Sequence, residues 1–312
     1  MPRTPRPGFG RRPTRLCCCW PTASWPSAAC GAHAAGPSRR SMSSPPKQSV
    51  AVPGGQLAYL RSGSGPPLLV INGFAATGED WDPTFLQALA ARHELIVPDN
   101  RGIGASSDDG GPLGIDRLAG DCASLIQALG LGPASILGWS MGGFVAQTMA
   151  LDHPGCVGRL VLLATDPGGP GAQLGDPNVL AQIADLSPPP EEQARRLLEL
   201  LLPAELARRL YSEAGDIVAA ARARLTQDLI DRQMDAMAAW HREGVGDRLA
   251  DLSVPTLIAA GTDDRVIPAS NSLSLTNTIP GAWLIQFAGA GHGLMAQYPK
   301  ALGRLVDEFL AL

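Results

Sequence analysis

Three segments of the chain carry residue types that together can perform nucleophilic chemistry at a carbonyl group. Ser140 lies in Gly138–Gly143, which reads Gly-Trp-Ser-Met-Gly-Gly and matches the pattern G-x-S-x-G. A serine hydroxyl is a weak nucleophile and needs a general base beside it. His292, in a glycine-rich loop, is the candidate base, and Asp264 is the candidate acid that orients the histidine. The three residues occur in the chain order Ser, Asp, His, which is one of the orders known for such triads.

The elements around Ser140 are those that a strained nucleophile turn needs. An apolar run at 134–137 predicts a strand before the serine, and 143–151 predicts a helix after it. A very tight turn is required to lift the serine clear of a sheet, so the positions two before and two after it must be small. Gly138 and Gly142 meet this condition. The helix that follows directs its amino end at the site, which favours negative charge there.

His292 is selected among five histidines by its position. It follows the last predicted strand, 283–287, and therefore lies at the carboxyl edge of the predicted sheet, level with Ser140. The other histidines lie in places that suit it less: His33, His93, His153 and His241. For the acid, Asp264 follows the strand 256–260, and Asp263 and Asp166 remain as alternatives.

Cleavage of an acyl compound also needs two backbone N–H groups aimed at the developing oxyanion. One is expected from Met141, directly after the serine. The other is expected from the loop after the strand 68–71, where Gly73 permits a turn and Phe74 carries the candidate N–H.

The elements that must position these residues alternate along the chain between apolar strands and amphipathic helices. Besides those above, strands are predicted at 94–98 and 159–163, and helices at 82–92, 115–129 and 299–310. Continuous apolar strands are typical of a sheet covered on both faces, and strand–helix alternation favours parallel pairing. The predicted fold class is therefore α/β, with a doubly wound, mostly parallel sheet.

A stretch without predicted strands interrupts this alternation at 166–250. Helices are expected there at 191–202, 204–214 and 217–237. We interpret 48–165 and 251–312 as the core and 166–250 as a helical cap, because ligands bind at the carboxyl edge of parallel sheets. Met234, Met237 and Trp240 are candidates for an apolar acyl pocket, although packing between helices would explain them as well.

Four segments in this order resemble the signature segments of the α/β-hydrolase superfamily: 99–106, 138–143, 261–268 and 289–293. The resemblance covers about residues 50–312, except for the detail of the insertion. It implies an α/β-hydrolase fold and a cofactor-free serine hydrolase, similar to esterases, perhydrolases, enol-lactonases and carbon–carbon bond hydrolases. The chain has Asn72-Gly73 where relatives often have His-Gly.

Composition excludes several other classes of protein. The net charge of −4 argues against a nucleic-acid-binding face. No phosphate-binding, dinucleotide or metal-ligand motif occurs, so we expect no cofactor and no metal. The uncharged stretch 122–151 is broken by Pro133 and paired glycines, so no membrane span is expected.

The first 47 residues are rich in Arg, Pro and Ser and contain no acidic residue. We interpret them as a disordered extension, with Met42 opening the domain, because Cys17–Cys19 lack the spacing of a metal site. Beyond it only Cys122 and Cys156 remain, which favours a reducing, cytoplasmic location.

The predicted function is hydrolysis of a small carboxylic ester or related acyl substrate through an acyl-enzyme. An alternative keeps Ser140, Asp264 and His292 but cleaves a lactone or a carbon–carbon bond, or acts as a perhydrolase. A further alternative is a ligand-binding protein on a hydrolase scaffold. The sequence leaves the oligomeric state open.

Overall fold

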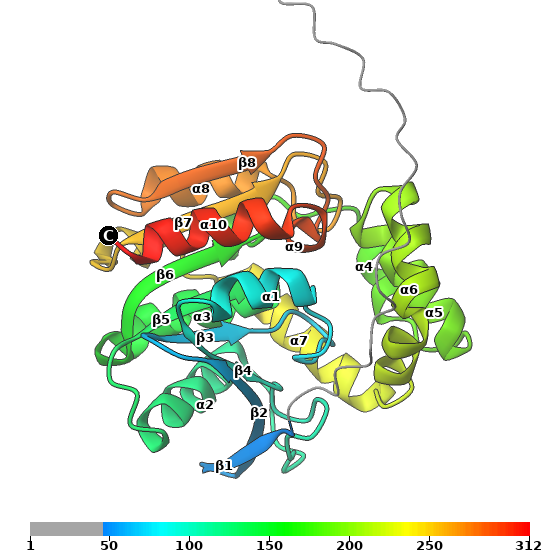
Figure 1. The fold of residues 1–312 in the computed structure, drawn as a ribbon, viewed down its shortest axis with the longest axis horizontal. Helices are drawn as coiled ribbons and strands as arrows, with labels where there is room; N and C mark the ends of the chain where they lie inside the picture. Colours follow the sequence, from blue (N-terminus) through cyan, green and yellow to red (C-terminus); the bar gives the residue numbers. More distant parts are fainter. Residues whose placement is uncertain (1–45) are drawn as a thin grey trace, which may run out of the picture. The chain divides into compact units, whose positions relative to one another are not determined.

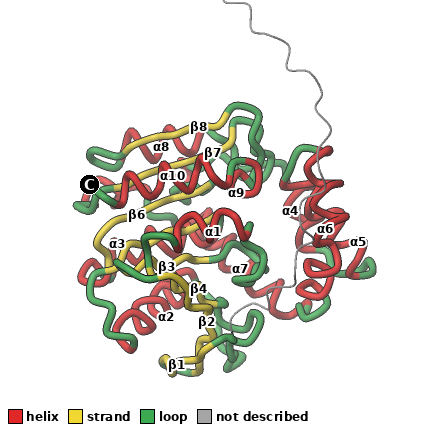
Figure 2. The backbone as a smooth tube through the Cα atoms, viewed as in Figure 1, coloured by secondary structure: helices red, strands yellow, loops and turns green. Residues whose placement is uncertain are grey.

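The computed structural model describes residues 46–312 (Figures 1 and 2). Nearly all of the predicted extension 1–47, with Met42 and Cys17–Cys19, lies outside the described residues. At its end, Lys47 is already joined to the core, because its Nζ donates to Asp99 Oδ2 at 2.6 Å. No described helix is both long and apolar enough to cross a membrane.

One eight-stranded sheet forms the centre of the described chain, with the strand order β1-β2-β4-β3-β5-β6-β7-β8. The strands from β3 onward pair in parallel, whereas β1 and β2 pair antiparallel with each other and β2 pairs antiparallel with β4. The predicted mostly parallel α/β fold is therefore confirmed. The strands are β1 (Gln48–Val52), β2 (Gly55–Gly63), β3 (Pro67–Ile71), β4 (Glu94–Pro98), β5 (Ala134–Trp139), β6 (Val157–Leu163), β7 (Thr256–Gly261) and β8 (Trp283–Phe287).

Helices cover both faces of the sheet, as the continuous apolar strands predict. Alternate residues of β3 face opposite ways: Leu68 and Val70 belong to one apolar cluster, and Leu69 and Ile71 to the other. The first cluster includes side chains of α1 (Pro83–Ala90) and α10 (Pro299–Leu310), which also contact each other. The second includes side chains of α2 (Ile115–Ala128), α3 (Met141–Asp152) and α8 (Ser270–Thr278).

The segment between β6 and β7 contains helices and no strand, as predicted. Its α-helices are α4 (Pro177–Ala184), α5 (Pro190–Leu201), α6 (Ala204–Arg222) and α7 (Gln227–Glu243). Figure 1 shows α4, α5 and α6 grouped beside one edge of the sheet, with α7 leading back toward it.

The expected single helix over 217–237 is wrong. Its first turns belong to α6, which ends at Arg222, and a new helix, α7, begins at Gln227. Thr226 causes the new start, because its backbone is extended and its hydroxyl accepts the N–H of Leu229 at 3.3 Å, as an N-cap does.

Candidate active site

The turn between β5 and α3 holds Ser140 in a strained backbone conformation. Ser140 has φ 57° and ψ −124°, a region that non-glycine residues rarely adopt. A Cβ on Gly138 would overlap the carbonyl oxygen of Gly142, and a Cβ on Gly142 would overlap that of Ile71. The two positions next but one to the serine must therefore be glycine, as the sequence pattern indicates.

Thr165 stabilises this turn from the next strand connection. Its Oγ1 donates to the carbonyl oxygen of Ser140 at 2.9 Å, and the Ser140 N–H donates to the Leu163 carbonyl oxygen at 2.9 Å. Both contacts depend on the parallel neighbour β6. Sequence reasoning missed Thr165, since no local pattern links it to residue 140.

Backbone strain gathers at this edge of the sheet. Within residues 46–312, the non-glycine residues with positive φ are Ala75, Ser140 and Ala164. They follow the carboxyl ends of β3, β5 and β6, which are neighbours in the sheet in the order β3-β5-β6. Strain of this kind concentrates where a fold positions groups for chemistry or binding.

His292 and Asp264 form a buried pair at the same edge. His292 Nδ1 lies 2.8 Å from Asp264 Oδ2, and the two side chains are 3% and 0% exposed. The other carboxylate oxygen, Oδ1, accepts the N–H groups of Val266 and Ile267 at 2.8 and 2.9 Å. The Asp264 side chain is thus fixed by its own loop, and it in turn fixes the imidazole.

The two loops that carry this pair are joined through the backbone. The Asp263 N–H donates to Ala290 O at 2.8 Å, and the Thr262 N–H donates to Phe287 O at 3.0 Å. A Cβ on Gly261 would overlap the carbonyl oxygen of Ala290, so the loops pack too closely for a side chain there.

Trp139 places His292 beside the serine turn. Its Nε1 donates to the His292 carbonyl oxygen at 3.1 Å, and the indole and imidazole ring centres are 5.4 Å apart. Within the described chain, no hydrogen bond of ordinary length joins the Ser140 hydroxyl to the imidazole. Catalytic hydrogen bonds are often long before substrate is bound, so the lack of a short Ser140–His292 hydrogen bond is compatible with proton transfer once substrate is bound.

The two alternative acids point elsewhere. Asp263 is exposed, and its carboxylate accepts a hydrogen bond from Thr262 Oγ1 at 3.1 Å. Asp166 is 1% exposed and holds α7: its oxygens lie 3.0 Å from Trp240 Nε1 and 3.3 Å from His241 Nε2. Of the three candidate acids, Asp264 is therefore the one that the structure brings to His292.

Two backbone N–H groups lie near Ser140 and could bind an oxyanion. The N–H groups of Met141 and Phe74 have no hydrogen-bond partner among residues 46–312. A Cβ built on Gly73 would lie 3.3 Å from the Cβ of Ser140, so the loop after β3 runs directly beside the serine. Asn72 fixes this loop, because its Nδ2 donates to Pro98 O at 2.7 Å and its Oδ1 accepts Trp81 Nε1 at 2.5 Å.

Successive residues of α7 contact the loops that follow β4, β3 and β6, in the order in which these strands lie in the sheet. Leu229 contacts the loop after β4 at Gly102, Gln233 bonds to the loop after β3 at Ala75, and Trp240 reaches Asp166 after β6. Leu229 and Trp240 are separated along the helix by about 16 Å, and three strand spacings, from β4 to β6, amount to about 14 Å. The inner face of α7 therefore spans the part of the edge that holds Ser140.

This face of α7 is apolar apart from Gln233. Phe144, on α3 directly after the serine turn, stacks on Trp240 with ring centres 4.9 Å apart. Met237 and Trp240 are buried, whereas Met234 is only partly buried. Trp240 thus acts in helix packing.

The loop after β3 also carries a carboxylate with an unusual environment. Asp80 Oδ2 accepts the Thr77 N–H at 2.6 Å, and loss of solvation raises the pKa of Asp80. Burial lowers the pKa of Arg222, on α6, to about 10, and its Nη2 donates to Ile183 O at 2.8 Å.

No group of three or more potential metal ligands occurs among the described residues.

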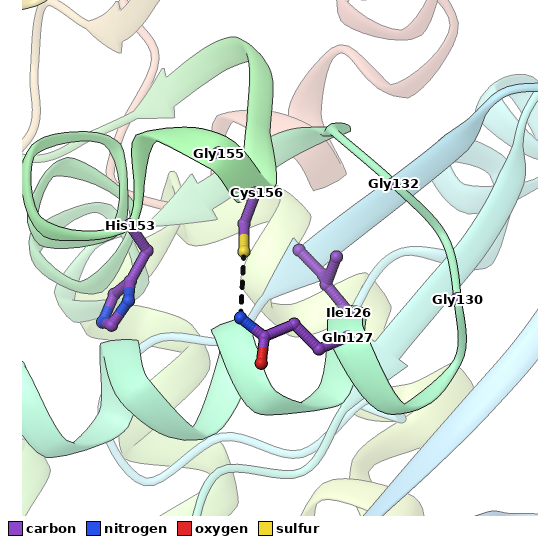
Figure 3. Close-up of a pocket in the computed structure, with 7 residues that line it drawn as sticks. All are labelled: Ile126, Gln127, Gly130, Gly132, His153, Gly155 and Cys156. Carbon is purple, nitrogen blue, oxygen red and sulfur yellow. Dashed lines mark hydrogen bonds between the residues drawn. The ribbon is translucent and has the colours of Figure 1, made fainter.

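A surface hollow lies at the opposite edge of the sheet (Figure 3). It is lined by residues that precede β5 and β6, among them Gly132, His153 and Cys156. Gln127 Nε2 lies 3.9 Å from Cys156 Sγ across it. Because it faces the amino ends of the strands, this hollow is not part of the Ser140 site.

Comparison with known proteins identifies the family. The model of the alpha/beta hydrolase fold family matches residues 66–297, which is most of the chain. The chain belongs to this family, as the resemblance of its motifs implied, and it is a hydrolase of that fold.

Individual relatives differ in what their names say they act on. A protein of Azorhizobium caulinodans named "Putative carbamate hydrolase RutD" is 32% identical over 257 residues, which cover 81% of this chain and 94% of that protein. The crystal structure of a hydrolase from Pseudomonas aeruginosa is 30% identical, with a TM-score of 0.70, and covers 85% of this chain and 98% of that one. The esterase RhEst1 of Rhodococcus is 26% identical, with a TM-score of 0.71, and covers 86% and 98%.

Proposed function

We propose that the protein is a serine hydrolase that cleaves a small carboxylic ester or related acyl substrate through an acyl-enzyme. One observation carries this proposal. The buried Asp264–His292 pair, 2.8 Å apart, lies at the same sheet edge as a strained serine, and two backbone N–H groups near that serine have no partner in the described part of the chain. The fold alone requires none of these features.

In the first half of the proposed reaction, Ser140 Oγ attacks the ester carbonyl carbon while His292 Nε2 takes the hydroxyl proton. The carbonyl oxygen becomes an oxyanion, which accepts hydrogen bonds from the N–H groups of Met141 and Phe74. The proton on His292 then passes to the leaving alcohol oxygen as the carbon–oxygen bond breaks. Ser140 is left acylated.

In the second half, water attacks the acyl carbon, and His292 takes its proton and returns it to Ser140 Oγ as the acid leaves. Asp264 accepts the Nδ1–H of His292 in both halves. It thereby keeps the Nε2 lone pair directed at the serine and stabilises the imidazolium. No cofactor and no metal take part in this proposal, and the substrate is its only partner.

Carbamate hydrolysis is the second candidate, because a relative 32% identical over most of its length carries that name. It uses the same three side chains, since a carbamate also presents a carbonyl carbon with a leaving group. A lactone, a perhydrolase reaction or a carbon–carbon bond would draw on the same groups. We also propose a cytoplasmic location, because Cys122 and Cys156 are both buried and form no disulfide within residues 46–312.

The test combines labelling and turnover. We expect the protein to be labelled by a fluorophosphonate and to hydrolyse short p-nitrophenyl esters, and Ser140→Ala to abolish both. An unlabelled wild-type protein would favour a ligand-binding role, and an active Ser140→Ala variant would refute the assignment. A panel of esters, carbamates, lactones and diketones then separates the candidate reactions.

A further inference from the structure

Gln233 is a polar residue on the inner, otherwise apolar face of α7. It is 0% exposed. Its Oε1 accepts the N–H of Ala75 at 2.9 Å, whereas its Nε2 has no hydrogen-bond partner within the described residues. A buried amide group without a partner is rare, because burial removes its hydrogen bonds to water and no hydrogen bond within the protein replaces them.

The orientation of the Gln233 amide is fixed by its neighbour. The Ala75 backbone N–H can only donate, so the atom facing it must be the amide oxygen. The NH2 group therefore points away from Ala75, and exchanging the two amide atoms would set two donors against each other. The unpartnered donor is thus a consequence of the fold.

The side-chain amide of Gln233 lies at the loop that carries one of the two proposed oxyanion donors. Ala75 follows Phe74, whose N–H is one of the two proposed oxyanion donors, and it has φ 55°. Gln233 lies four residues after Leu229, which is above β4, and seven before Trp240, which is above β6. These separations, about 6 and 10 Å along the helix axis, put Gln233 between the ends of β3 and β5, from which the two donors come.

We propose that Gln233 is a specificity-determining residue whose Nε2 donates a hydrogen bond to an acceptor oxygen that the substrate carries next to its scissile carbonyl. This inference rests on the proposed acyl hydrolysis and adds the substrate class: acyl groups with an ether, keto or similar oxygen near the reacting carbon. Such a substrate satisfies the unpartnered donor, and a purely aliphatic acyl group does not.

Gln233 is also a positioning residue for the loop after β3, since its Oε1 holds the peptide that follows Phe74. Removing the side chain should therefore slow the hydrolysis of every substrate. A general loss of rate would not distinguish recognition of substrate from support of the loop. The ratio of rates on two matched substrates does.

The experiment compares p-nitrophenyl methoxyacetate with p-nitrophenyl butyrate. Their acyl chains have equal length and differ by an oxygen in place of one methylene, so the same leaving group departs from both. The ratio of the two kcat/KM values is measured for the wild type, Gln233→Met and Gln233→Glu. Gln233→Met removes donor and acceptor, whereas Gln233→Glu, as a carboxylate, keeps an oxygen for the Ala75 N–H, has no donor and adds a negative charge.

Gln193→Met is the matched control, because Gln193 is another buried glutamine of the insertion, only 5% exposed. Its Nε2 donates to the carbonyl oxygens of Leu186 and Pro188, and its Oε1 accepts Arg222 Nε, so it bonds within the insertion alone.

We expect the methoxyacetate-to-butyrate ratio to fall roughly 3- to 10-fold in both Gln233 variants, the effect of one neutral hydrogen bond, and to stay at the wild-type value in Gln193→Met. An active wild type whose ratio is unchanged in both Gln233 variants overturns the role of Gln233 and leaves the proposed function standing. A wild type that neither labels at Ser140 nor hydrolyses either ester overturns the proposed function and this inference with it.

Discussion

Replacement of Asp264 by asparagine tests the proposed mechanism at its most buried contact. Oδ1 of Asp264 accepts two backbone N–H groups, at 2.8 and 2.9 Å, and an asparagine oxygen would stay there. The new NH2 group must then occupy the place of Oδ2, 2.8 Å from His292 Nδ1. Because that NH2 can only donate, Nδ1 must become the acceptor and the imidazole proton must move to Nε2.

A proton on Nε2 removes the lone pair that would accept the Ser140 hydroxyl proton. We therefore expect Asp264→Asn to lower kcat by about 10⁴-fold, the effect of the same exchange in a serine protease triad. KM should change little, because the side chain is 0% exposed and is shielded from substrate by the imidazole. The fold should be kept, since the two backbone hydrogen bonds of the loop persist.

The assay is steady-state hydrolysis of p-nitrophenyl butyrate, with thermal unfolding of each variant as the check on folding. Asp263→Asn is the matched control, because its exposed carboxylate faces Thr262; it should stay within about twofold of wild type, as most exposed substitutions do. The reasoning fails if a folded Asp264→Asn protein retains more than about a tenth of wild-type kcat, or if Asp263→Asn loses as much.

Two further predictions concern stability. The pKa of Asp80 is raised by burial, so the folded state binds its proton more tightly than the unfolded state, and this contribution to stability falls as pH rises above about 4. Asp80→Asn removes that fall. The free energy of unfolding of the variant minus that of the wild type, both measured in urea, should therefore increase from pH 4 to pH 7. A difference that stays constant over this range would contradict the raised pKa. Gly120 lies inside α2 with open space where a Cβ would be, so Gly120→Ala should stabilise the protein by about 1 kcal/mol, seen as a rise in Tm of roughly 2–4 °C. An unchanged or lower Tm would show that the helix does not tolerate the added methyl group.

The sequence allowed prediction of those parts of the site that local pattern determines. The glycines around Ser140 have a steric cause within a single turn, and Asp264 and His292 each follow a largely apolar strand. Parallel pairing then brings the ends of such strands to one edge whatever the loops contain. The prediction for Met141 rests on adjacency alone, because it directly follows Ser140 in the chain.

Contacts between distant segments could not be predicted in this way. The hydrogen bond from Thr165 to Ser140 spans 25 positions, and that between Ala75 and Gln233 spans 158. Each depends on how one element docks on another, and neither partner stands out in its own segment. Gln233 does interrupt the apolar face of α7, and such an interruption is the one signal that could have drawn attention to it.

Two errors in element assignment have local causes. Strands β1 and β2 were missed because they pair antiparallel at the outside of the sheet and mix polar with apolar residues. The break between α6 and α7 was missed because no glycine or proline marks it. The signal there is a single N-cap threonine, Thr226, in an alanine-rich region that favours helix on both sides.

The insertion is attached to the core at several separate loops, and this bears on how selectivity arises. Helix α5 meets the histidine loop where the Gly293 N–H donates to Leu201 O at 3.0 Å. Helix α7 meets the loop after β3 through Gln233 and the loop after β6 through Trp240 and His241. A segment that only covered the site would influence how well substrates bind. Because this one also holds the peptide beside a proposed oxyanion donor and contacts the loop of the proposed base, changes in its inner face should alter stabilisation of the transition state, and therefore kcat, together with binding. Selectivity and rate are in that case properties of the same contacts, which α5 and α7 make with the loops of the proposed site.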